Sequence, residues 1–346
     1  MGIAALNPSY VKPVWSLLLN GISNSLAWSA RRVRAMCYSA QVYEQFAKYV
    51  REFGADIDIH QFVKLYVDRR DGARIKIPKA MDANFANPKT AEERQIEALI
   101  AEYNAGQAMK FEQELFAQTK RLADAERTLL TKTTKAATES KRIATDKISK
   151  AKVTLDDLRR ADLKDRDSRI FPGNYAPVMV MEAGRRVVKP MRYQCRPAGK
   201  PAFYDNKYPG TYNARRDNLE RFWKGVFGVS HGVMVVNTYY ENVEGEDGKN
   251  RVLQFTPRDG SDMLVACLWS HWTDPAGKEP DLLSFAAITD EPEPEVLAAG
   301  HDRSIINLKP EHLDAWLSPT GDLRALHALF DDQQHPYYEY KLEQAA

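Results

Sequence analysis

Hydrophobic residues recur at helical spacing soon after residue 40. In the stretch "QVYEQFAKYVREFG" they share one helical face: Val42, Phe46, Tyr49, Val50 and Phe53. The stretch ends at Gly54, as amphipathic helices often do, so the pattern predicts a helix. The next stretch, "DIHQFVKLYVDR", has the same character and predicts a second helix. We therefore expect residues 37–87 to be folded.

The segment from Lys89 to Arg169 has a different pattern. Proline is absent, glycine occurs only at position 106, and Ala, Glu, Lys, Arg and Leu dominate. Leu115, Leu122 and Leu129 repeat every seven residues, which predicts long helices paired as a coiled-coil hairpin. An antiparallel hairpin also brings the two ends of an insertion close together. Residues 132–152 are rich in Lys and Thr, which fits either a solvated helical tip or a basic arm that contacts nucleic-acid phosphates.

After Phe171 the chain alternates between short apolar runs and Gly, Pro, Asn or Asp. The runs that predict strands are "APVMVME", "RRVVKPMRYQ", "GVMVVNTYYENV", "RVLQFTP", "DMLVACLWSHW" and "LLSFAAITDE". The run "KPEHLDAWL" has Pro at its start and predicts a short helix. The sequence as a whole therefore predicts an α+β fold, with a strand-rich core and a long helical insertion.

Composition narrows the class of protein. The chain has 346 residues, 44% of them apolar, and a net charge of +2, so a globular protein of one or two domains is expected without a surface that is basic throughout. Three cysteines without paired spacing favour a reducing cytoplasm over a disulfide framework. No apolar run reaches the roughly 18 residues that a membrane span needs. We expect no membrane association, no zinc site and no cofactor, because no Cys/His cluster has ligand spacing and no phosphate-binding glycine loop is present.

Four further motifs stand in a fixed order along the chain. They are "MCYSA" at 36–40, "TYNARRDNLERF" at 211–222, "VNTYYENVEG" at 236–245 and "EVLAAGHDRSIINLKPEHLDAWL" at 295–317. Together with "NYAP" at 174–177 and "MRY" at 191–193, they resemble the SRAP family, the SOS response-associated peptidases of abasic-site processing. The resemblance implies a catalytic domain made of residues 36–88 and 170–346, interrupted by the helical insertion at 89–169.

The chain also departs from the family pattern. The family start Met-Cys-Gly-Arg is Met-Cys-Tyr-Ser here, so an arginine near the N-terminus is missing. Tyr193 and Asn242 stand where the family has tryptophans, and the acidic residue after Asn-Ala-Arg is Asp217 rather than part of a Glu-Thr pair. These differences concern the contacts with DNA more than the chemistry.

The resemblance implies a reaction at Cys37. Family members lose the initiator Met, and the exposed N-terminal Cys forms a thiazolidine ring with the aldehyde of an abasic site in single-stranded DNA. The ring needs an amine and a thiol on adjacent carbons, and an α-amine titrates near pH ~8, so part of it is nucleophilic at neutral pH. An internal Cys37 cannot react in this way. We therefore expect Met36 to be the functional start, with residues 1–35 either untranslated or removed.

Residues 1–35 have two readings. They contain the apolar run "VWSLLLNGI" followed by Arg31, Arg32 and Arg34, which is the wrong order for a secretory signal. In one interpretation, these residues follow from an upstream start codon and Met36 is the true start. In the other, they are a presequence that targets an organelle.

The remaining catalytic roles also follow from the resemblance. Glu241 is the candidate general acid/base, and His301 is a second proton-transfer group. Asn213 can orient the Cys37 amine or the sugar by hydrogen bonding.

Three residues are expected to bind DNA. Arg215 can clamp a phosphate with two hydrogen bonds, and Tyr193 can stack on a base. Arg192, which precedes Tyr193 in the sequence, is the third expected DNA-binding residue.

Other functions remain open at this point. Cys37, His301 and Glu241 are also the residue types of a cysteine peptidase, one that processes only itself included. A non-catalytic DNA-binding protein is a third possibility, with the insertion docking a protein partner. We expect the partner to be single-stranded DNA with abasic sites, the protein to be a monomer, and the location to be the cytoplasm, at the nucleoid when DNA is bound. Cys195 and Cys267 lie in apolar runs and are expected in the core.

Overall fold

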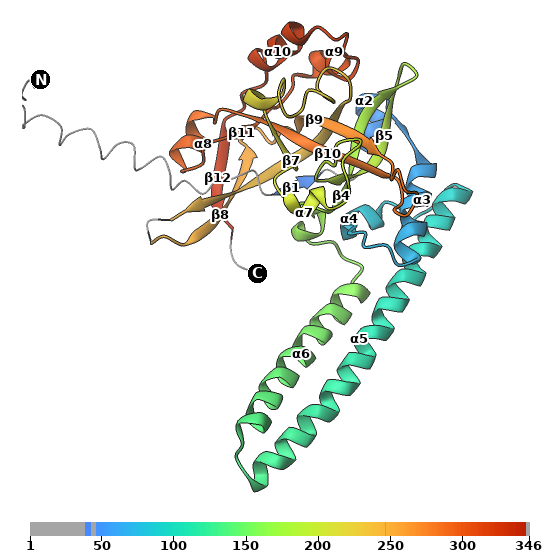
Figure 1. The fold of residues 1–346 in the computed structure, drawn as a ribbon, viewed down its shortest axis with the longest axis vertical. Helices are drawn as coiled ribbons and strands as arrows, with labels where there is room; N and C mark the ends of the chain where they lie inside the picture. The colour runs from blue at the N-terminus through green and yellow to red at the C-terminus, as the bar shows by residue number, and fades with distance from the viewer. Residues whose placement is uncertain (1–38, 43–45, 246, 344–346) are drawn as a thin grey trace, which may run out of the picture. The chain divides into compact units, whose positions relative to one another are not determined.

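The computed structural model describes residues 39–42, 46–245 and 247–343. All of these residues belong to one compact unit of the chain, which spans residues 36–346 (Figure 1). Cys37, and with it the predicted start of the functional chain, lies outside the described residues.

Twelve strands in the described part of the chain form one sheet. Their bounds are β1 Ser39–Val42, β2 Asp56–Ile57, β3 Arg169–Ile170, β4 Tyr175–Glu182, β5 Arg185–Tyr193, β6 Asn213–Arg215, β7 His231–Glu244, β8 Asn250–Pro257, β9 Met263–Trp272, β10 Leu282–Asp290, β11 Ser304–Ile305 and β12 Tyr338–Leu342. All six strands that the apolar runs predict are present. Strand β9 pairs with both β7 and β10, so that β10, β5, β4, β7 and β9 close into a barrel-like ring.

Helices cover and extend this sheet (Figure 1). Their bounds are α2 Phe46–Phe53, α3 Ile59–Arg70, α4 Lys79–Ala83, α5 Ala91–Thr131, α6 Lys135–Arg159, α7 Tyr204–Lys207, α8 Pro294–Ala298, α9 Leu313–Leu317 and α10 Leu323–Asp331. Short 3-10 turns are η1 Asp165–Ser168, η2 Arg216–Asn218 and η3 Pro310–His312. No helix in the described ranges is long and apolar enough to cross a membrane.

The N-terminal helix is shorter than predicted. Val42, which shares the helical spacing, instead ends β1, and α2 begins at Phe46. The difference arises because β1 pairs with β7 on one side and β3 on the other, and these backbone hydrogen bonds outweigh a local helical pattern. The second predicted helix is present as α3, and "KPEHLDAWL" forms η3 and α9.

The predicted helical hairpin is confirmed, over a narrower range. Helix α5 begins with a capping box, in which Thr90 Oγ1 accepts from the Glu93 N–H and the Glu93 carboxylate accepts from the Thr90 N–H. At the start of α6 there is a single capping bond, in which Thr134 Oγ1 accepts from the Ala137 N–H at 3.1 Å. The helices end at Arg159, and Arg169, which the sequence placed in the insertion, belongs to β3 of the sheet.

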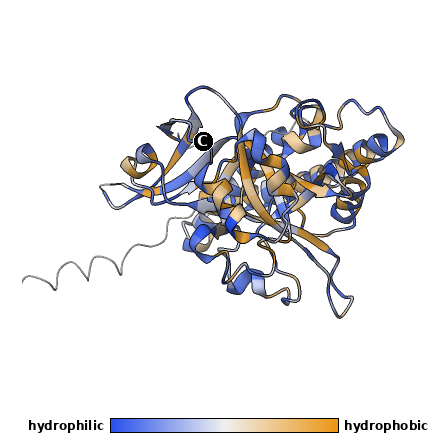
Figure 2. Ribbon diagram, turned by 90° about the horizontal axis from the view of Figure 1, so that it is seen from above, coloured by the Kyte–Doolittle hydropathy of each residue, from blue (hydrophilic) through white to orange (hydrophobic). Residues whose placement is uncertain are grey.

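The strands divide their side chains between two clusters, because successive residues of a strand point to opposite faces. One cluster contains Val233 and Ala266 and is covered by Trp316 of α9 and Phe330 of α10. The other contains Tyr193, Phe285 and Tyr239 on the opposite face of the strands. Figure 2 shows hydrophobic colour concentrated along the strands. The second face carries the candidate site.

Candidate active site

Glu241 and His301 meet in the interior of the protein. Glu241 lies near the end of β7 and pairs with Leu253 of β8, while His301 lies in the loop between α8 and β11. His301 Nε2 is 3.1 Å from Glu241 Oε2, and both side chains have 0% exposure. Gly300, with φ of +98°, lets the chain turn sharply after α8, and the His301 N–H then bonds to the Val296 carbonyl at 3.1 Å. The structure thus brings together two predicted catalytic residues.

The hydrogen bonds of His301 define its proton state. Nδ1 lies 2.8 Å from the Arg303 carbonyl, and because a carbonyl only accepts, Nδ1 carries the proton. A neutral ring then has only a lone pair at Nε2, so a hydrogen bond to Glu241 requires one additional proton on the pair. Burial lowers the pKa of His301, although the bond to the Arg303 carbonyl opposes this. A buried carboxylate and imidazole this close together are suited to proton transfer once the pair holds that proton.

Asn213 is held by Tyr193. The Tyr193 hydroxyl donates to Asn213 Oδ1 at 3.1 Å, and Asn213 has 6% exposure in β6. The Tyr193 ring stacks on Phe285 with centroids 5.2 Å apart and meets Tyr212 edge-on at 5.6 Å. With only 2% of its surface exposed, Tyr193 offers no face to a base, so the predicted stacking role does not fit this arrangement. Strand alternation explains the burial, because Tyr193 shares a strand face with Met191 in the core.

Strand β10 connects these parts of the site. Its residue Ala287 pairs with Asn213 of β6, and Thr289 pairs with Ile305 of β11, the strand that follows His301. The same sheet therefore fixes Asn213 and the chain leading from His301 relative to each other.

The two predicted DNA-binding arginines differ in availability. The Arg215 side chain is 41% exposed and makes a two-bond contact with the more exposed Asp217, at 3.0 and 2.7 Å. Arg192 is mostly buried, 2.8 Å from Asp205 and hydrogen-bonded to the Gln194 carbonyl. Burial would raise the pKa of Asp205, but hydrogen bonds from arginines outweigh it and the pKa is lowered. Arg215 can thus exchange its partner for a phosphate more readily than Arg192.

Arg169 is a positioning residue that sequence reasoning missed. Its Nε donates to Ser39 Oγ at 2.9 Å, and its guanidinium lies 3.8 Å from the centroid of the Tyr240 ring. It also pairs with Glu343. These contacts hold the start of β1 against β7, one residue from Glu241, because Ser39 pairs with Tyr240. Its position within a charged segment gave no signal of this role.

The cysteines in the described part of the chain do not form a nucleophile. Cys195 and Cys267 are buried, as expected, and burial raises the pKa of Cys195 to about 12 and also raises that of Cys267. Among the described residues, no group of three His, Cys, Asp or Glu side chains could hold a metal ion. Cys37 is thus the cysteine on which the predicted chemistry depends.

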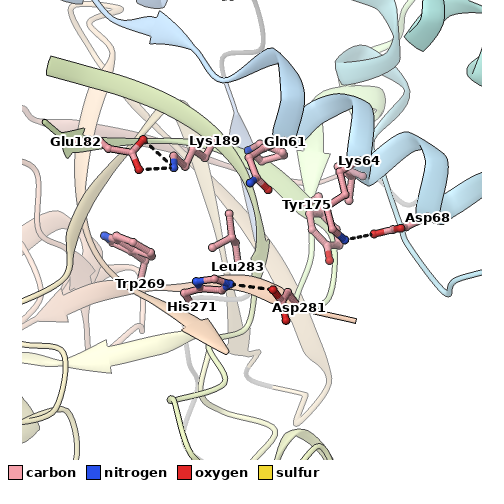
Figure 3. Close-up of a pocket in the computed structure, with 12 residues that line it drawn as sticks. Gln61, Lys64, Asp68, Tyr175, Glu182, Lys189, Trp269, His271, Asp281 and Leu283 are labelled. Atoms are coloured by element: carbon pink, nitrogen blue, oxygen red, sulfur yellow. Dashed lines mark hydrogen bonds and ion pairs between the residues drawn. The ribbon is translucent and has the colours of Figure 1, made fainter. Parts of the chain in front are cut away.

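A separate pocket of about 350 Å³ lies between α3 and the strands β5, β9 and β10 (Figure 3). Trp269 and Leu283 contribute its apolar wall. Its charged groups already pair within the wall: Lys64 with Asp68 at 2.7 Å, Lys189 with Glu182 at 2.9 Å, and His271 with Asp281 at 3.5 Å. None of the predicted site residues lines it.

Comparison with solved structures gives weak similarities. A protein from Bordetella bronchiseptica is 18% identical, with a TM-score of 0.42, over 54% of this chain and 90% of the other. A protein from Bacteroides thetaiotaomicron is 15% identical, with a TM-score of 0.43, over 51% of this chain and 77% of the other. A phage-related protein from Bordetella bronchiseptica is 18% identical, with a TM-score of 0.39, over 51% and 81%. No curated protein matches the chain.

Comparison with protein families gives a clear match. The model of the family described as SOS response associated peptidase (SRAP) matches residues 127–344, which is more than half of the chain. The match begins inside α5 and covers α6, the strands from β3 onward, and the segments that contain Asn213, Glu241 and His301. The family name refers to the SOS response, the bacterial response to DNA damage. The chain belongs to the SOS response associated peptidase family.

Proposed function

We propose that this protein processes abasic sites in single-stranded DNA by forming a covalent thiazolidine link through Cys37 as its N-terminal residue. The observation that carries the proposal is the fully buried Glu241–His301 pair, 3.1 Å apart, beside the first described strand. Ser39 pairs with Tyr240, the neighbour of Glu241. Cys37 precedes Ser39 by two residues, and two residues span at most about 7 Å. A link of this length is short enough to bring Cys37 near the pair, which supports the proposal.

The proposed reaction has two bond-forming steps. The Cys37 amine adds to the sugar aldehyde and the resulting hydroxyl leaves as water, which gives an imine. The Cys37 thiol then adds to the imine carbon, its proton passes to nitrogen, and the five-membered ring closes. Ring opening of the sugar and loss of water each need a proton donor, and Glu241 with His301 can supply and recover one proton at each step. The adduct therefore has the combined mass of the protein and the DNA, less one water.

Asn213 and the arginines support this chemistry. The Tyr193 hydroxyl fixes the orientation of the Asn213 amide, which can then align the Cys37 amine or the sugar. Arg215 can bind a neighbouring phosphate by exchanging Asp217 for it. Arg192 serves better as a structural support of the DNA-binding surface, since Asp205 already holds it.

A catalytic domain made of residues 36–88 and 170–346, with the insertion at 89–169, accommodates these roles. Residues 1–35 and Met36 must then be absent from the active form, because a peptide bond at the Cys37 nitrogen prevents imine formation.

Intact mass spectrometry tests the proposal. Protein that begins at Cys37, mixed with an oligonucleotide that carries one abasic site, should gain the mass of the oligonucleotide minus one water. The adduct should form without a reducing agent, which distinguishes the ring from a simple imine. Matched controls are Cys37→Ala and a protein with one extra residue before Cys37. Adduct formation by either control would refute the assignment of Cys37.

A second candidate, a cysteine peptidase, uses the same residue types, with Cys37 as its nucleophile. His301 would then have to turn one ring nitrogen towards Cys37 and give up a present neighbour, either the Arg303 carbonyl at Nδ1 or Glu241 at Nε2. A thiolate attacks through sulfur alone, so acetylation of the Cys37 amine would leave peptidase activity intact and abolish thiazolidine formation. Peptide hydrolysis by the acetylated protein, without DNA adducts from the unmodified one, would favour the peptidase.

A further inference from the structure

Helix α5 has a second apolar stripe, distinct from the one that faces α6. Met109, Phe116 and Leu130 are among the most exposed large hydrophobic side chains, at 60%, 77% and 87% exposure. Ala123 is exposed in the same series, so these four residues follow one another at intervals of seven. We call them the outer stripe. Isolated exposed apolar residues are ordinary, but residues at intervals of seven lie along one side of a helix, where a second helix can cover them together.

The outer stripe lies on the side of α5 that faces away from α6. Gln118 and Ala125, with 9% and 6% exposure, mark the buried side of this part of the helix. Phe116 precedes Gln118 by two residues, which places it about 160° around the helix. Figure 1 shows α5 and α6 side by side along this part of the hairpin. The residues of α5 that pack with α3, Ile96 and Leu99, come before the stripe begins.

The two edges of the outer stripe carry opposite charges. The edge three residues after each stripe position carries two acidic residues, Glu112 and Glu126, with Thr119 between them. The edge four residues after each stripe position carries two basic residues, Lys120 and Arg127, preceded by Gln113. A two-fold axis parallel to the helix brings the acidic edge of one copy against the basic edge of another, whereas an antiparallel pair brings like charges together. The outer stripe is therefore complementary to itself in the parallel orientation.

We propose that two copies of this chain associate through the outer stripes of α5, with the helices parallel. Met109, Phe116, Ala123 and Leu130 then meet their own counterparts across the two-fold axis. Glu126 of each copy faces Arg127 of the other. The stripe drifts by about 20° per heptad, so the helices supercoil gently to keep it in contact. This dimer replaces the monomer that the sequence led us to expect.

The ion pairs already present at the edges do not oppose this association. Glu126 lies 3.0 Å from Lys141, Glu112 lies 2.5 Å from Arg159, and Arg127 lies 3.0 Å from Asp124. All six side chains are about half or more exposed, and such surface pairs contribute little because water and salt screen them. They can therefore share or exchange partners when a second copy approaches.

Sedimentation equilibrium of the full chain without DNA tests the dimer, at roughly 1 to 100 µM, the range where modest interfaces populate dimers. The expected result is a concentration-dependent dimer. Phe116→Glu should raise the dimer dissociation constant by at least about 30-fold, because it removes the central aromatic of the interface from both copies. The matched control is Val153→Glu, a 61% exposed apolar residue on α6 outside the stripe, which should leave the constant unchanged. Circular dichroism of both variants confirms that the helices remain intact.

A charge exchange tests the orientation. Glu126→Lys or Arg127→Glu alone should weaken the dimer about tenfold, because each substitution introduces two repulsive contacts. The double variant should restore it, because the edges again carry opposite charge. A monomer at every concentration, or a dimer that Phe116→Glu leaves intact, overturns the proposed interface. A dimer that either single charge variant strengthens is antiparallel, and overturns the proposed orientation.

Discussion

His231 should make the stability of the protein depend on pH. It has 2% exposure in β7, and its ring stacks on Trp316 with centroids 3.8 Å apart. Nδ1 donates to the Trp316 carbonyl at 2.8 Å, and Nε2 accepts from the Gly228 N–H at 2.8 Å. A proton on Nε2 would face that N–H, so the fold accommodates only the neutral ring. Burial accordingly lowers the pKa of His231 to about 4, against the opposing hydrogen bond to the Trp316 carbonyl.

The size and direction of the effect follow from this pKa. The ordinary value is 6.5, and the difference from about 4 corresponds to about 3 kcal/mol, at about 1.36 kcal/mol for each pH unit. Above pH 6.5 the ring is neutral in both the folded and the unfolded chain, so the full stability is present. As the pH falls from 6.5 towards 4, the unfolded chain binds a proton that the folded chain does not. The free energy of unfolding therefore falls by about 3 kcal/mol across this window.

Denaturant unfolding of the wild type and His231→Gln measures the effect. A glutamine amide can also donate and accept, but it does not titrate. The variant should be less stable at pH 7, because the stacking on Trp316 is lost, and the difference should shrink by about 3 kcal/mol as the pH approaches 4. Other titrating groups are common to both proteins and cancel in the comparison.

A matched control separates titration from the loss of a side chain. His271→Gln replaces a histidine whose side chain is 52% exposed on β9, and such surface substitutions have small effects. A stability difference for His231→Gln that stays constant from pH 7 to pH 4 would refute the assignment of the neutral ring. The outcome also defines the pH range in which cross-linking rates report chemistry rather than unfolding.

Three further predictions concern the site and the hairpin. Glu241→Gln and His301→Ala should each slow adduct formation by about 10²–10⁴-fold while changing DNA affinity much less, and equal rates in gel-based time courses would contradict their roles. Replacing residues 95–165 by a short Gly-Ser bridge should weaken single-strand binding and flatten its salt dependence, with cross-linking at saturating DNA retained; loss of cross-linking in a folded protein would place the insertion in the active site. Ala144→Leu, at a fully buried position between α5 and α6, should lower the melting temperature by overpacking. An unchanged melting curve would contradict the close packing of α6 on α5 at this position.

The strand-rich body could be predicted because each strand left a local signal. Alternating or continuous apolar runs bounded by Gly, Pro, Asn and Asp predicted all six long strands. Val42 shows the limit of this reasoning, because its helical spacing was overridden by pairing with a strand almost 200 residues away. Pairings over such separations leave no local pattern, so the closure of the ring through β9 could not be predicted.

The candidate site was found through motifs rather than through periodicity. Nothing local to Glu241 or His301 indicates that their side chains meet, because one lies in a strand and the other in a loop sixty residues later. Tyr193 was a different kind of miss. Tyr193 lies two residues after Met191 in one predicted strand, so both side chains should point to the same, inward face. Its place in a family motif nevertheless suggested contact with DNA. Arg169 gave no signal, since a cation next to a charged helical segment resembles any solvated residue.

Helix α5 shows why a heptad pattern alone does not specify an interface. Its sequence contains two series, one through Leu115, Leu122 and Leu129 and the other through the outer stripe. The leucines are partly buried on the side of α5 that faces α6, and α6 contributes the buried Ala144 and Ala151 to the same contact. The sequence therefore correctly predicted a hairpin. The outer stripe has the same period and also carries large apolar side chains, yet α6 can cover only one side of α5. A single helix that carries apolar residues on opposite sides needs a second neighbour to bury them. The charge division along its edges makes a second copy of this chain the neighbour that fits.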